Sequence, residues 1–416
     1  MKLRKSGRLL LAAATSLGAG LALTSCSPSN TVDYVYVAAS KNNPGQINVY
    51  LADSLSGALT QIQESPYPSG GRNPVAMVTS PNGKYLYVVN KDDNNIVQFA
   101  IGTDAKIYPQ QTCNTPGSAP LAIAVNQSGT FLYVVDQYSP QYPGGPVYSS
   151  SNPGPGDVVV YPLNSNQALT GCTPVTQTFV DSSNTTQTAT YVPVGMNPTG
   201  VSALANGNYV YVSAQNSASS LGEVYAFNVA SGGTLSNVAG SPFQAGTSPS
   251  SLIAVTSQNG TYLYVTDSLQ NQLITFTILS TGALSPNPNG PTKTDTLPFN
   301  ITVDPRGQYL YVANYNANDI SAYAIGSNGT PSAVAGAGTY ATGAGPFCVL
   351  VEPALGRFVY TANFIDNTVT GFELNPNTGA LTSTQNSPYS ASGQPTCAAA
   401  IPHGNHSLQN VQSTAG

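Results

Sequence analysis

Charge is scarce in this chain of 416 residues, and so are the side chains that most often bind metals. Charged residues make up 7% of the sequence, against about 25% in an ordinary soluble domain. The 17 acidic and 12 basic residues give a formal net charge of −5, which argues against the basic surface that nucleic-acid binding requires. Tryptophan is absent, and both histidines, His403 and His406, lie near the C-terminus. We therefore expect no nucleic-acid partner and no zinc site.

Apolar and turn-forming residues are abundant instead. Hydrophobic residues make up 41% of the chain, which also contains 25 Tyr, 40 Gly and 32 Pro. A chain of this length and composition can bury a sizeable core, and its aromatic and β-branched content argues against disorder.

The N-terminus has the pattern of an export signal. Residues 9–23 form an apolar stretch after four basic residues, and this stretch is shorter than the ~20 residues of a spanning helix. The stretch ends in Leu23-Thr24-Ser25-Cys26, which resembles the bacterial lipobox, whose cysteine is lipidated on sulfur and becomes the new N-terminus. The alternative is an ordinary signal peptide with an incidental cysteine.

The lipobox resemblance implies a particular maturation and location. Residues 1–25 would be a cleaved lipoprotein signal peptide, Cys26 would carry the lipid, and 26–32 would form a tether. Several acyl chains on one cysteine anchor a protein stably to a membrane. We expect an extracytoplasmic, lipid-anchored protein in the periplasm or on the cell surface, and Ser27 favours the outer membrane if the cell has one.

One short pattern recurs seven times: an aromatic residue, an aliphatic residue, Tyr, and usually Val. We call each copy a Tyr/Val strand; the copies begin at Tyr34, Tyr85, Phe131, Tyr209, Tyr262, Tyr309 and Phe358. A Gly turn precedes six copies, and a short apolar run opened by Pro precedes that turn. Both alternating faces of the strand are apolar, so both must be covered. A repeat of about 50 residues with four short strands is typical of a β-propeller.

We predict an all-β fold: a seven-bladed β-propeller of four-stranded antiparallel blades over residues 33–406, followed by a flexible tail at 407–416. The series of Pro runs and the series of Tyr/Val strands are shifted by one repeat along the chain. The first Tyr/Val strand, at Tyr34, has no Pro run before it, and the last Pro run, from Pro395 to Pro402, has no Tyr/Val strand after it. We expect these terminal strands to pair in one blade and close the ring. We expect a monomer with a single domain.

These motifs resemble the lactonase family of seven-bladed propellers, which includes 6-phosphogluconolactonase-like and YVTN-repeat proteins. The resemblance implies lactone hydrolysis, with Arg and His just after the Pro of the innermost strands, at the mouth of the ring. The two positions after each Pro here match neither residue: they hold Val75-Ala76, Leu121-Ala122, Thr199-Gly200, Ser250-Ser251, Phe299-Asn300, Phe347-Cys348 and Thr396-Cys397.

A few polar residues remain as site candidates. Arg72, just before Pro74, is the cation that the pattern places at the mouth. Asn or Asp follows five Tyr/Val strands, where it either caps its own loop or faces the mouth and binds a ligand or Ca²⁺. The weak catalytic candidates are Asp136, Asp267 and Arg72; the ligand-binding candidates of this group are Asn90, Asn314 and Asn363. We expect no resident cofactor, with Ca²⁺ as the open alternative.

Blade three is longer than the others. The interval from Pro120 to Pro198 is more than half as long again as the other Pro intervals, and the surplus falls at 137–156 and 173–195. We expect both loops to rise on the mouth face, where loops of a rigid scaffold carry binding. Four tyrosines there either stack on sugar rings or a partner or only order the loops: Tyr138, Tyr142, Tyr148 and Tyr191.

Four cysteines follow Cys26, and an even number outside the cytoplasm indicates disulfides. Cys348 and Cys397 each lie two residues after the Pro of successive inner strands, so they are at equal height in neighbouring blades. Cys113 and Cys172 lie in outer segments of adjacent blades. Both pairings are possible on this pattern.

Two functional hypotheses follow. The scarcity of charge at the mouth favours a binding or interaction scaffold for a neutral glycan or an envelope protein. The alternative, carried by the family resemblance, is a secreted lactone hydrolase or related cyclase, whose general base would be Asp136, Asp267 or a bound metal.

Overall fold

The computed structural model describes residues 30–181, 183–216, 218–219, 221–334 and 338–403. The predicted signal peptide, Cys26, His406 and the predicted tail lie outside the described residues. The blades belong to one compact unit that begins at Thr31. Within the described residues, no helix has the length and hydropathy needed to cross a membrane.

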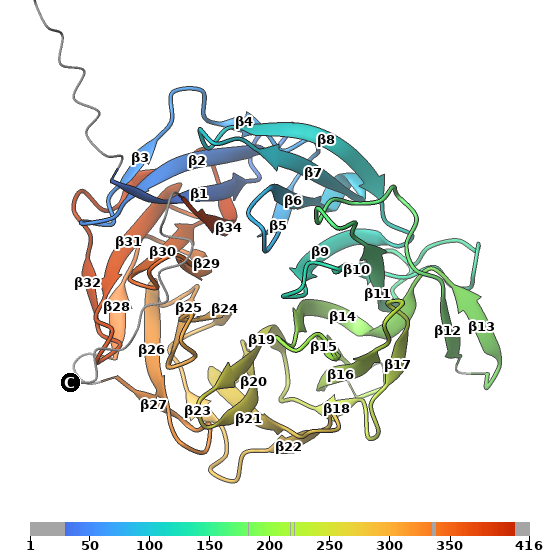
Figure 1. Cartoon of the computed structure of the whole chain (residues 1–416). Coiled ribbons are helices and arrows are strands. Elements are labelled where there is room, and N and C mark those ends of the chain that lie inside the picture. Colours follow the sequence, from blue (N-terminus) through green and yellow to red (C-terminus); the bar gives the residue numbers. More distant parts are fainter. Residues whose placement is uncertain (1–29, 182, 217, 220, 335–337, 404–416) are drawn as a thin grey trace, which may run out of the picture. The chain divides into compact units, whose positions relative to one another are not determined.

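Seven antiparallel blades stand around a common axis (Figure 1). We number them 1 to 7 by their Tyr/Val strands, and in each blade the strands run outward from an inner strand. Blade 1 contains β34 (Pro395–Pro402), β1 (Thr31–Ala39), β2 (Gln46–Asp53), β3 (Leu59–Gln61) and β4 (Tyr67–Pro68). Blade 2 contains β5 (Pro74–Thr79), β6 (Tyr85–Asn90), the short 3-10 helix η1 (Lys91–Asp93), β7 (Asn95–Ile101) and β8 (Ile107–Asn114).

Blades 3 and 4 share one long strand. Blade 3 contains β9 (Ser118–Val125), β10 (Phe131–Tyr138) and β11 (Pro155–Pro162), with an outlying hairpin of β12 (Gln177–Val180) and β13 (Thr186–Ala189). Strand β14 (Val192–Ala203) pairs first with β11 and then with β15 (Tyr209–Gln215). It thus ends blade 3 and begins blade 4, which continues with β16 (Gly222–Val229), β17 (Leu235–Asn237) and β18 (Phe243–Gln244).

The last three blades repeat one arrangement. Blade 5 contains β19 (Pro249–Ser257), β20 (Gly260–Asp267), β21 (Gln272–Ile278), β22 (Leu284–Pro286) and β23 (Thr292–Lys293). Blade 6 contains β24 (Pro298–Val303), β25 (Tyr309–Asn314), β26 (Asp319–Ile325), β27 (Pro331–Ala333) and β28 (Thr339–Ala341). Blade 7 contains β29 (Pro346–Val351), β30 (Phe358–Asn363), β31 (Thr368–Leu374), β32 (Leu381–Ser383) and β33 (Tyr389–Ser390).

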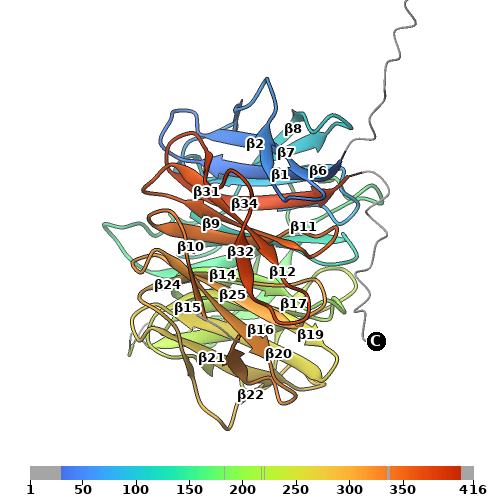
Figure 2. The same cartoon turned by 90° about the vertical axis from the view of Figure 1, so that its left-hand side faces the viewer.

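The two terminal strands pair with each other, as the offset of the repeats predicts. β1 is antiparallel to β34 from the pair Asp33–Pro402 to the pair Ala39–Pro395, and both views show the two strands side by side (Figure 1, Figure 2). β1 begins at Thr31 rather than at the predicted Asp33, because Val32 is already buried in the core. The predicted fold class, a seven-bladed propeller, is confirmed.

A tyrosine hydroxyl links each blade to the next in six of the seven interfaces. The second Tyr of a Tyr/Val strand is fully buried and donates a hydrogen bond to a backbone carbonyl in the outer turn of the following blade. The donor–acceptor pairs are Tyr36–Ala105, Tyr87–Gln167, Tyr211–Gly282, Tyr264–Gly329, Tyr311–Gly379 and Tyr360–Gly57. The last pair joins blade 7 to blade 1 and so contributes to closing the ring.

The acceptor turn is also built for close packing. Gly329 has φ +79, and a Cβ there would lie 2.3 Å from the ring of Tyr262, the first aromatic of the preceding Tyr/Val strand. A glycine adopts this backbone conformation without steric penalty. The first aromatic of the strand thus packs on the turn, while the second aromatic, Tyr264, hydrogen-bonds its carbonyl at 2.8 Å.

The interface between blades 3 and 4 uses a different side chain. Tyr133 Oη has no hydrogen-bond partner among the described residues. Gln177, from the insertion, occupies the corresponding turn: its Nε2 donates to Gly233 O at 3.1 Å and its Oε1 accepts from Leu235 N at 2.8 Å. The inserted hairpin is therefore fastened to blade 4 through a buried amide.

The difference between Tyr264, whose hydroxyl is hydrogen-bonded, and Tyr133, whose hydroxyl is not, makes the tyrosine contacts testable. We expect Tyr264→Phe to lower the free energy of unfolding by about 1–2 kcal/mol, because it leaves the buried Gly329 carbonyl without its donor. Tyr133→Phe removes a hydroxyl that has no partner, so we expect a change within about 0.5 kcal/mol. Urea unfolding of both variants measures the difference, and equal losses would contradict a role for the hydrogen bond.

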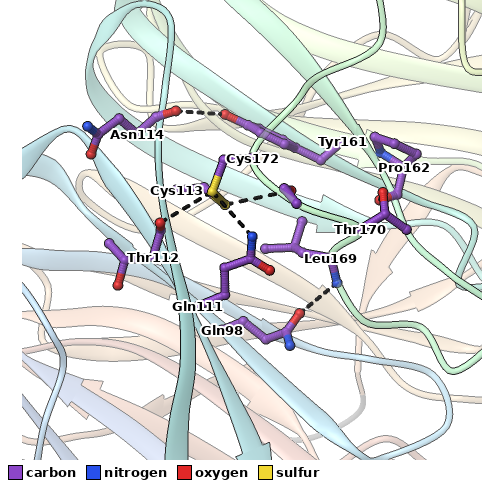
Figure 3. The surroundings of a disulfide bond; sticks show 11 residues. Gln98, Gln111, Thr112, Cys113, Asn114, Tyr161, Pro162, Leu169, Thr170 and Cys172 are labelled. Atoms are coloured by element: carbon purple, nitrogen blue, oxygen red, sulfur yellow. Dashed lines mark hydrogen bonds between the residues drawn. A yellow bond between two sulfur atoms is a disulfide. The ribbon is translucent and has the colours of Figure 1, made fainter.

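The structure settles the two cysteine pairings differently. Cys113 in β8 and Cys172 form a disulfide that joins blade 2 to blade 3 (Figure 3), which confirms this pairing. The pairing of Cys348 with Cys397 was wrong: both are free and buried. They lie on inner strands of neighbouring blades, which form no ladder with each other, and Cys348 Sγ accepts a hydrogen bond from Ala398 N at 3.2 Å instead.

Candidate functional site

The mouth of the ring is the end at which the inner strands begin. The loops after the Tyr/Val strands and the crossovers between blades lie at the same end. A cavity of about 520 Å³ opens there beside the inner strands β34, β5 and β29. Three basic residues contribute to its lining, namely Lys41, Arg72 and Lys91, together with Phe347 and Phe364.

Two of the three cations are unmatched by a carboxylate. Arg72 forms a salt bridge with Asp93 at 2.6 Å, and its Nε donates to the same carboxylate at 2.7 Å. This hydrogen bond raises the pKa of Arg72 and lowers that of Asp93. Within the described part of the chain, neither Lys41 nor Lys91 forms an ion pair. The cavity therefore carries an excess of positive charge.

Two lining residues, Phe347 and Phe364, belong to an aromatic cluster. Phe347 directly follows the Pro that opens β29, and its ring stacks on Phe364 with centroids 5.5 Å apart. Phe299 lies 4.1 Å from Phe347, and Tyr315 extends the cluster. Such faces accept the C–H side of a sugar ring or another flat apolar group. A ligand here would meet aromatic surface and cationic side chains together.

One carboxylate contributes to the same lining. Asp92 lies in η1 between Lys91 and Asp93, and its Oδ1 accepts a hydrogen bond from Asn73 Nδ2 at 3.1 Å. This contact orients the carboxylate, whose side chain remains exposed. A carboxylate held in this way can accept a proton from a water molecule.

Four lining residues were not predicted from the sequence: Lys41, Lys91, Phe347 and Phe364. Arg72 is one of three cations at the mouth and not the single one that the pattern placed there. A signal was present for the two lysines. Both lie in loops that directly follow a Tyr/Val strand, and strand alternation places these loops at the mouth. The aromatic pair had no comparable signal, because apolar residues such as Phe347 also follow Pro on other inner strands.

The Asn and Asp residues expected either to cap their loops or to face the mouth are buried. None of these five has measurable exposure: Asp136, Asp267, Asn90, Asn314 and Asn363. Asp267 accepts hydrogen bonds from Thr247 N and Ser248 N. Asn90 donates to Asn95 Oδ1 at 2.9 Å. Asn314 and Asn363 likewise donate to side chains of the adjacent strand, so these side chains hold the ends of neighbouring strands together.

Asp136 has an unusual neighbour. It faces Asp157 across the β10–β11 pair, and both are buried. Burial raises the pKa of Asp136 to about 7, and burial together with the charge of Asp136 raises that of Asp157 well above its usual range. Unless one of the two carboxyl groups carries a proton, Asp136 Oδ1 and both oxygens of Asp157 have no hydrogen-bond partner among the described residues. The pair is therefore an interior feature of blade 3.

The predicted tyrosines do not line the mouth cavity. The hairpin β12–β13 lies outside the ring of blades, away from the central opening (Figure 1), which corrects the expectation for the second insertion. Tyr142, Tyr148 and Tyr191 line a separate cavity beside that hairpin, whereas Tyr138 is not part of its lining. The structure thus brings three of the four together at a different place.

Comparisons with known proteins agree with this architecture. A family model described as "Lactonase, 7-bladed beta-propeller" matches residues 29–142 and 237–351, more than half of the chain. A protein of Pectobacterium carotovorum named 6-phosphogluconolactonase is 28% identical over 348 residues, which are 76% of this chain and 98% of the relative. A protein of Xenorhabdus nematophila with the same name is 34% identical over 99 residues, which are 24% of this chain and 28% of the relative.

Solved structures show the same fold at low sequence identity. A putative 6-phosphogluconolactonase of Bacteroides fragilis matches with a TM-score of 0.68 and 18% identity, over 90% of this chain and 99% of its own. The periplasmic gluconolactonase of Pseudomonas aeruginosa also matches with a TM-score of 0.68, at 17% identity, over 90% of this chain and 100% of its own.

Proposed function

We propose that this chain, which belongs to the lactonase family of seven-bladed β-propellers, hydrolyses the lactone of an anionic sugar acid in its mouth cavity. The observation that carries the proposal is the pairing of unmatched Lys41 and Lys91 with the Phe347–Phe364 face in one cavity. The names of the relatives from Pectobacterium and Xenorhabdus point to the same substrate class.

The cavity suggests a role for each group. The phosphate or carboxylate of the substrate would bind the two lysine ammonium groups, and its ring would lie on Phe347. Water adds to the lactone carbonyl, the ring C–O ester bond breaks, and the products are the open sugar acid and one proton. Asp92 is the carboxylate in this lining that can accept the proton of the attacking water.

Proton release by the purified full chain tests the proposal. We expect turnover of 6-phosphogluconolactone above spontaneous hydrolysis, measured with calcium and with a chelator. The double variant Lys41→Ala/Lys91→Ala should raise the KM for this substrate about tenfold or more, while a neutral gluconolactone changes little. Asp92→Asn should lower kcat about a hundredfold.

A matched control distinguishes the effect of removing positive charge at the mouth from the effect of removing positive charge elsewhere on the protein. Lys84 lies beside the turn at the opposite end of the ring, so Lys84→Ala should leave both KM and kcat unchanged. The proposal fails if the wild-type chain does not accelerate hydrolysis of either lactone, or if Lys84→Ala weakens substrate binding as much as the mouth variant does.

The expected site of this activity is outside the cytoplasm, with the chain held by lipid on Cys26. The lipobox resemblance of residues 23–26 supports this part of the proposal. Fractionation of cells tests the anchor. We expect the wild-type chain in the membrane fraction and the Cys26→Ala variant in the soluble fraction. An interaction role for a neutral glycan at the mouth is disfavoured by the excess positive charge there.

A further inference from the structure

A second cavity, of about 500 Å³, lies at the side of the ring beside the hairpin β12–β13. Its walls come from four places: the loop 139–155, the hairpin, the start of β14, and the outer strands β16 and β17 of blade 4. Both insertions of blade 3 contribute to it. The extra chain that distinguishes this blade from the other six therefore lines one cavity together with blade 4.

Buried contacts hold the walls of this cavity in place. Gln177 fastens β12 to the outer turn of blade 4 through Gly233 O and Leu235 N. Tyr191 is 3% exposed and donates from its hydroxyl to Pro140 O at 3.4 Å, which ties β14 to the other insertion. The cavity is thus preformed, so a ligand would not have to order it on binding.

The lining combines aromatic rings with uncharged hydrogen-bonding groups. Tyr142 is 59% exposed, and Phe179 packs against Tyr191 with centroids 5.9 Å apart. Tyr148 and Tyr225 add further ring surface. The lining also includes polar groups of Gln141, Thr178, Gln187 and Asn237.

This cavity is poorly suited to binding a charged ligand. No Lys, Arg or His is among the residues that line it. Its one carboxylate, Asp181, accepts hydrogen bonds from Ser183 N, Thr185 N and Gln187 Nε2, and these bonds lower its pKa. The carboxylate is therefore engaged in the hairpin turn. A charged ligand would be desolvated here without a counter-charge.

We propose that this cavity binds a neutral saccharide. Aromatic faces stack on the C–H side of sugar rings, and amide and hydroxyl groups between them match sugar hydroxyls. A volume of this size is in the range of ordinary small-ligand pockets, which suits a short oligosaccharide. The site is separate from the mouth cavity in position and opposite to it in charge preference.

Titration of the full chain with neutral oligosaccharides tests the inference. Maltotriose, cellotriose and chitotriose serve as probes, and isothermal titration and saturation-transfer NMR report binding. We expect at least one to bind, and we expect Tyr142→Ala to weaken that binding about tenfold. Tyr142 is exposed, so its loss should leave the fold intact; Gln141→Ala is a second, equally mild variant expected to weaken binding.

Control variants assign the result to this cavity. Phe347→Ala at the mouth should leave saccharide binding unchanged, and Tyr142→Ala should leave lactone turnover unchanged. Absence of binding by all three probes overturns the inference, as does binding that persists in both cavity variants. Binding of an extended peptide in place of the sugars would also overturn it and would assign the hairpin to protein recognition.

Discussion

Replacing Cys113 and Cys172 together by Ala is expected to lower the free energy of unfolding by about 4 kcal/mol. The disulfide closes a loop between residues separated by 59 positions, and the loss of unfolded-chain entropy grows with the length of that loop. The bond also joins the outer strand β8 of blade 2 to blade 3, where Gln111 Nε2 donates to Cys172 Sγ at 3.4 Å (Figure 3).

Reductant provides the matched control for this prediction. Guanidinium unfolding of the wild type in dithiothreitol should show nearly the same loss as the double variant, and the double variant itself should not respond to reductant. A Cys348→Ala/Cys397→Ala variant should keep the full response, because these two thiols are free. A wild type indifferent to reductant would show that the bond contributes little.

The fold could be predicted from the sequence because its signal is repeated in every blade. The Tyr/Val strand must be buried on both faces, and that requirement alone favours a stack of blades. The offset between Pro395 and Tyr34 then predicts closure, and the β1–β34 pair confirms it. The contacts that fasten neighbouring blades were not predicted, because a hydroxyl such as that of Tyr264 reaches a carbonyl in another repeat.

The candidate site was predicted less well, for physical reasons that differ between residues. Equal height of Cys348 and Cys397 follows from the repeat, but the direction of each sulfur depends on backbone positions that no pattern contains. Asp136 and Asp267 were placed at the correct loops, yet the strand ends carry their side chains into the interior. Lys41 and Lys91 line one cavity only because blades 1 and 2 are neighbours in space.

The second large effect concerns pH and the buried pair Asp136–Asp157. The native pair retains a proton that the unfolded chain releases near pH 4, since burial raises the pKa of Asp136 to about 7 and that of Asp157 as well. Between pH 4 and 7 the native state therefore binds more protons, so the free energy of unfolding falls as pH rises, by up to about 1.4 kcal/mol per pH unit for each proton retained.

Other buried carboxyl groups act in the same direction. Burial and the nearby charge of Glu352 raise the pKa of Asp33 well above its usual range, and burial raises that of Asp319 to about 6. Exposed groups act oppositely: hydrogen bonds lower the pKa of Asp93 and Asp181, so their stabilisation is lost only as pH falls below about 4. We expect the wild type to be about 2–4 kcal/mol less stable at pH 8 than at pH 5.

The substitution Asp157→Asn isolates the contribution of the Asp136–Asp157 pair to the pH dependence of stability. The amide can donate to Asp136 Oδ1, as Asn90 Nδ2 donates to Asn95 Oδ1 at 2.9 Å in blade 2 and Asn314 Nδ2 to Asp319 Oδ1 at 2.7 Å in blade 6. Asp136 is kept because its Oδ2 accepts from Gly117 N at 3.0 Å. We expect the variant to be about 2 kcal/mol more stable than the wild type at pH 8.

Measurements across pH decide whether the Asp136–Asp157 pair or the overall negative charge causes the loss of stability at high pH. Urea unfolding from pH 5 to 8 should give a flatter curve for Asp157→Asn than for the wild type, with a gain in stability that grows as the pH rises from 5 through 7. Asp104→Asn removes the same formal charge from an exposed turn and should leave the slope unchanged. If both substitutions flatten the curve equally, repulsion among the 17 acidic residues of this acidic chain explains the pH dependence better than two carboxyl groups that share a buried proton.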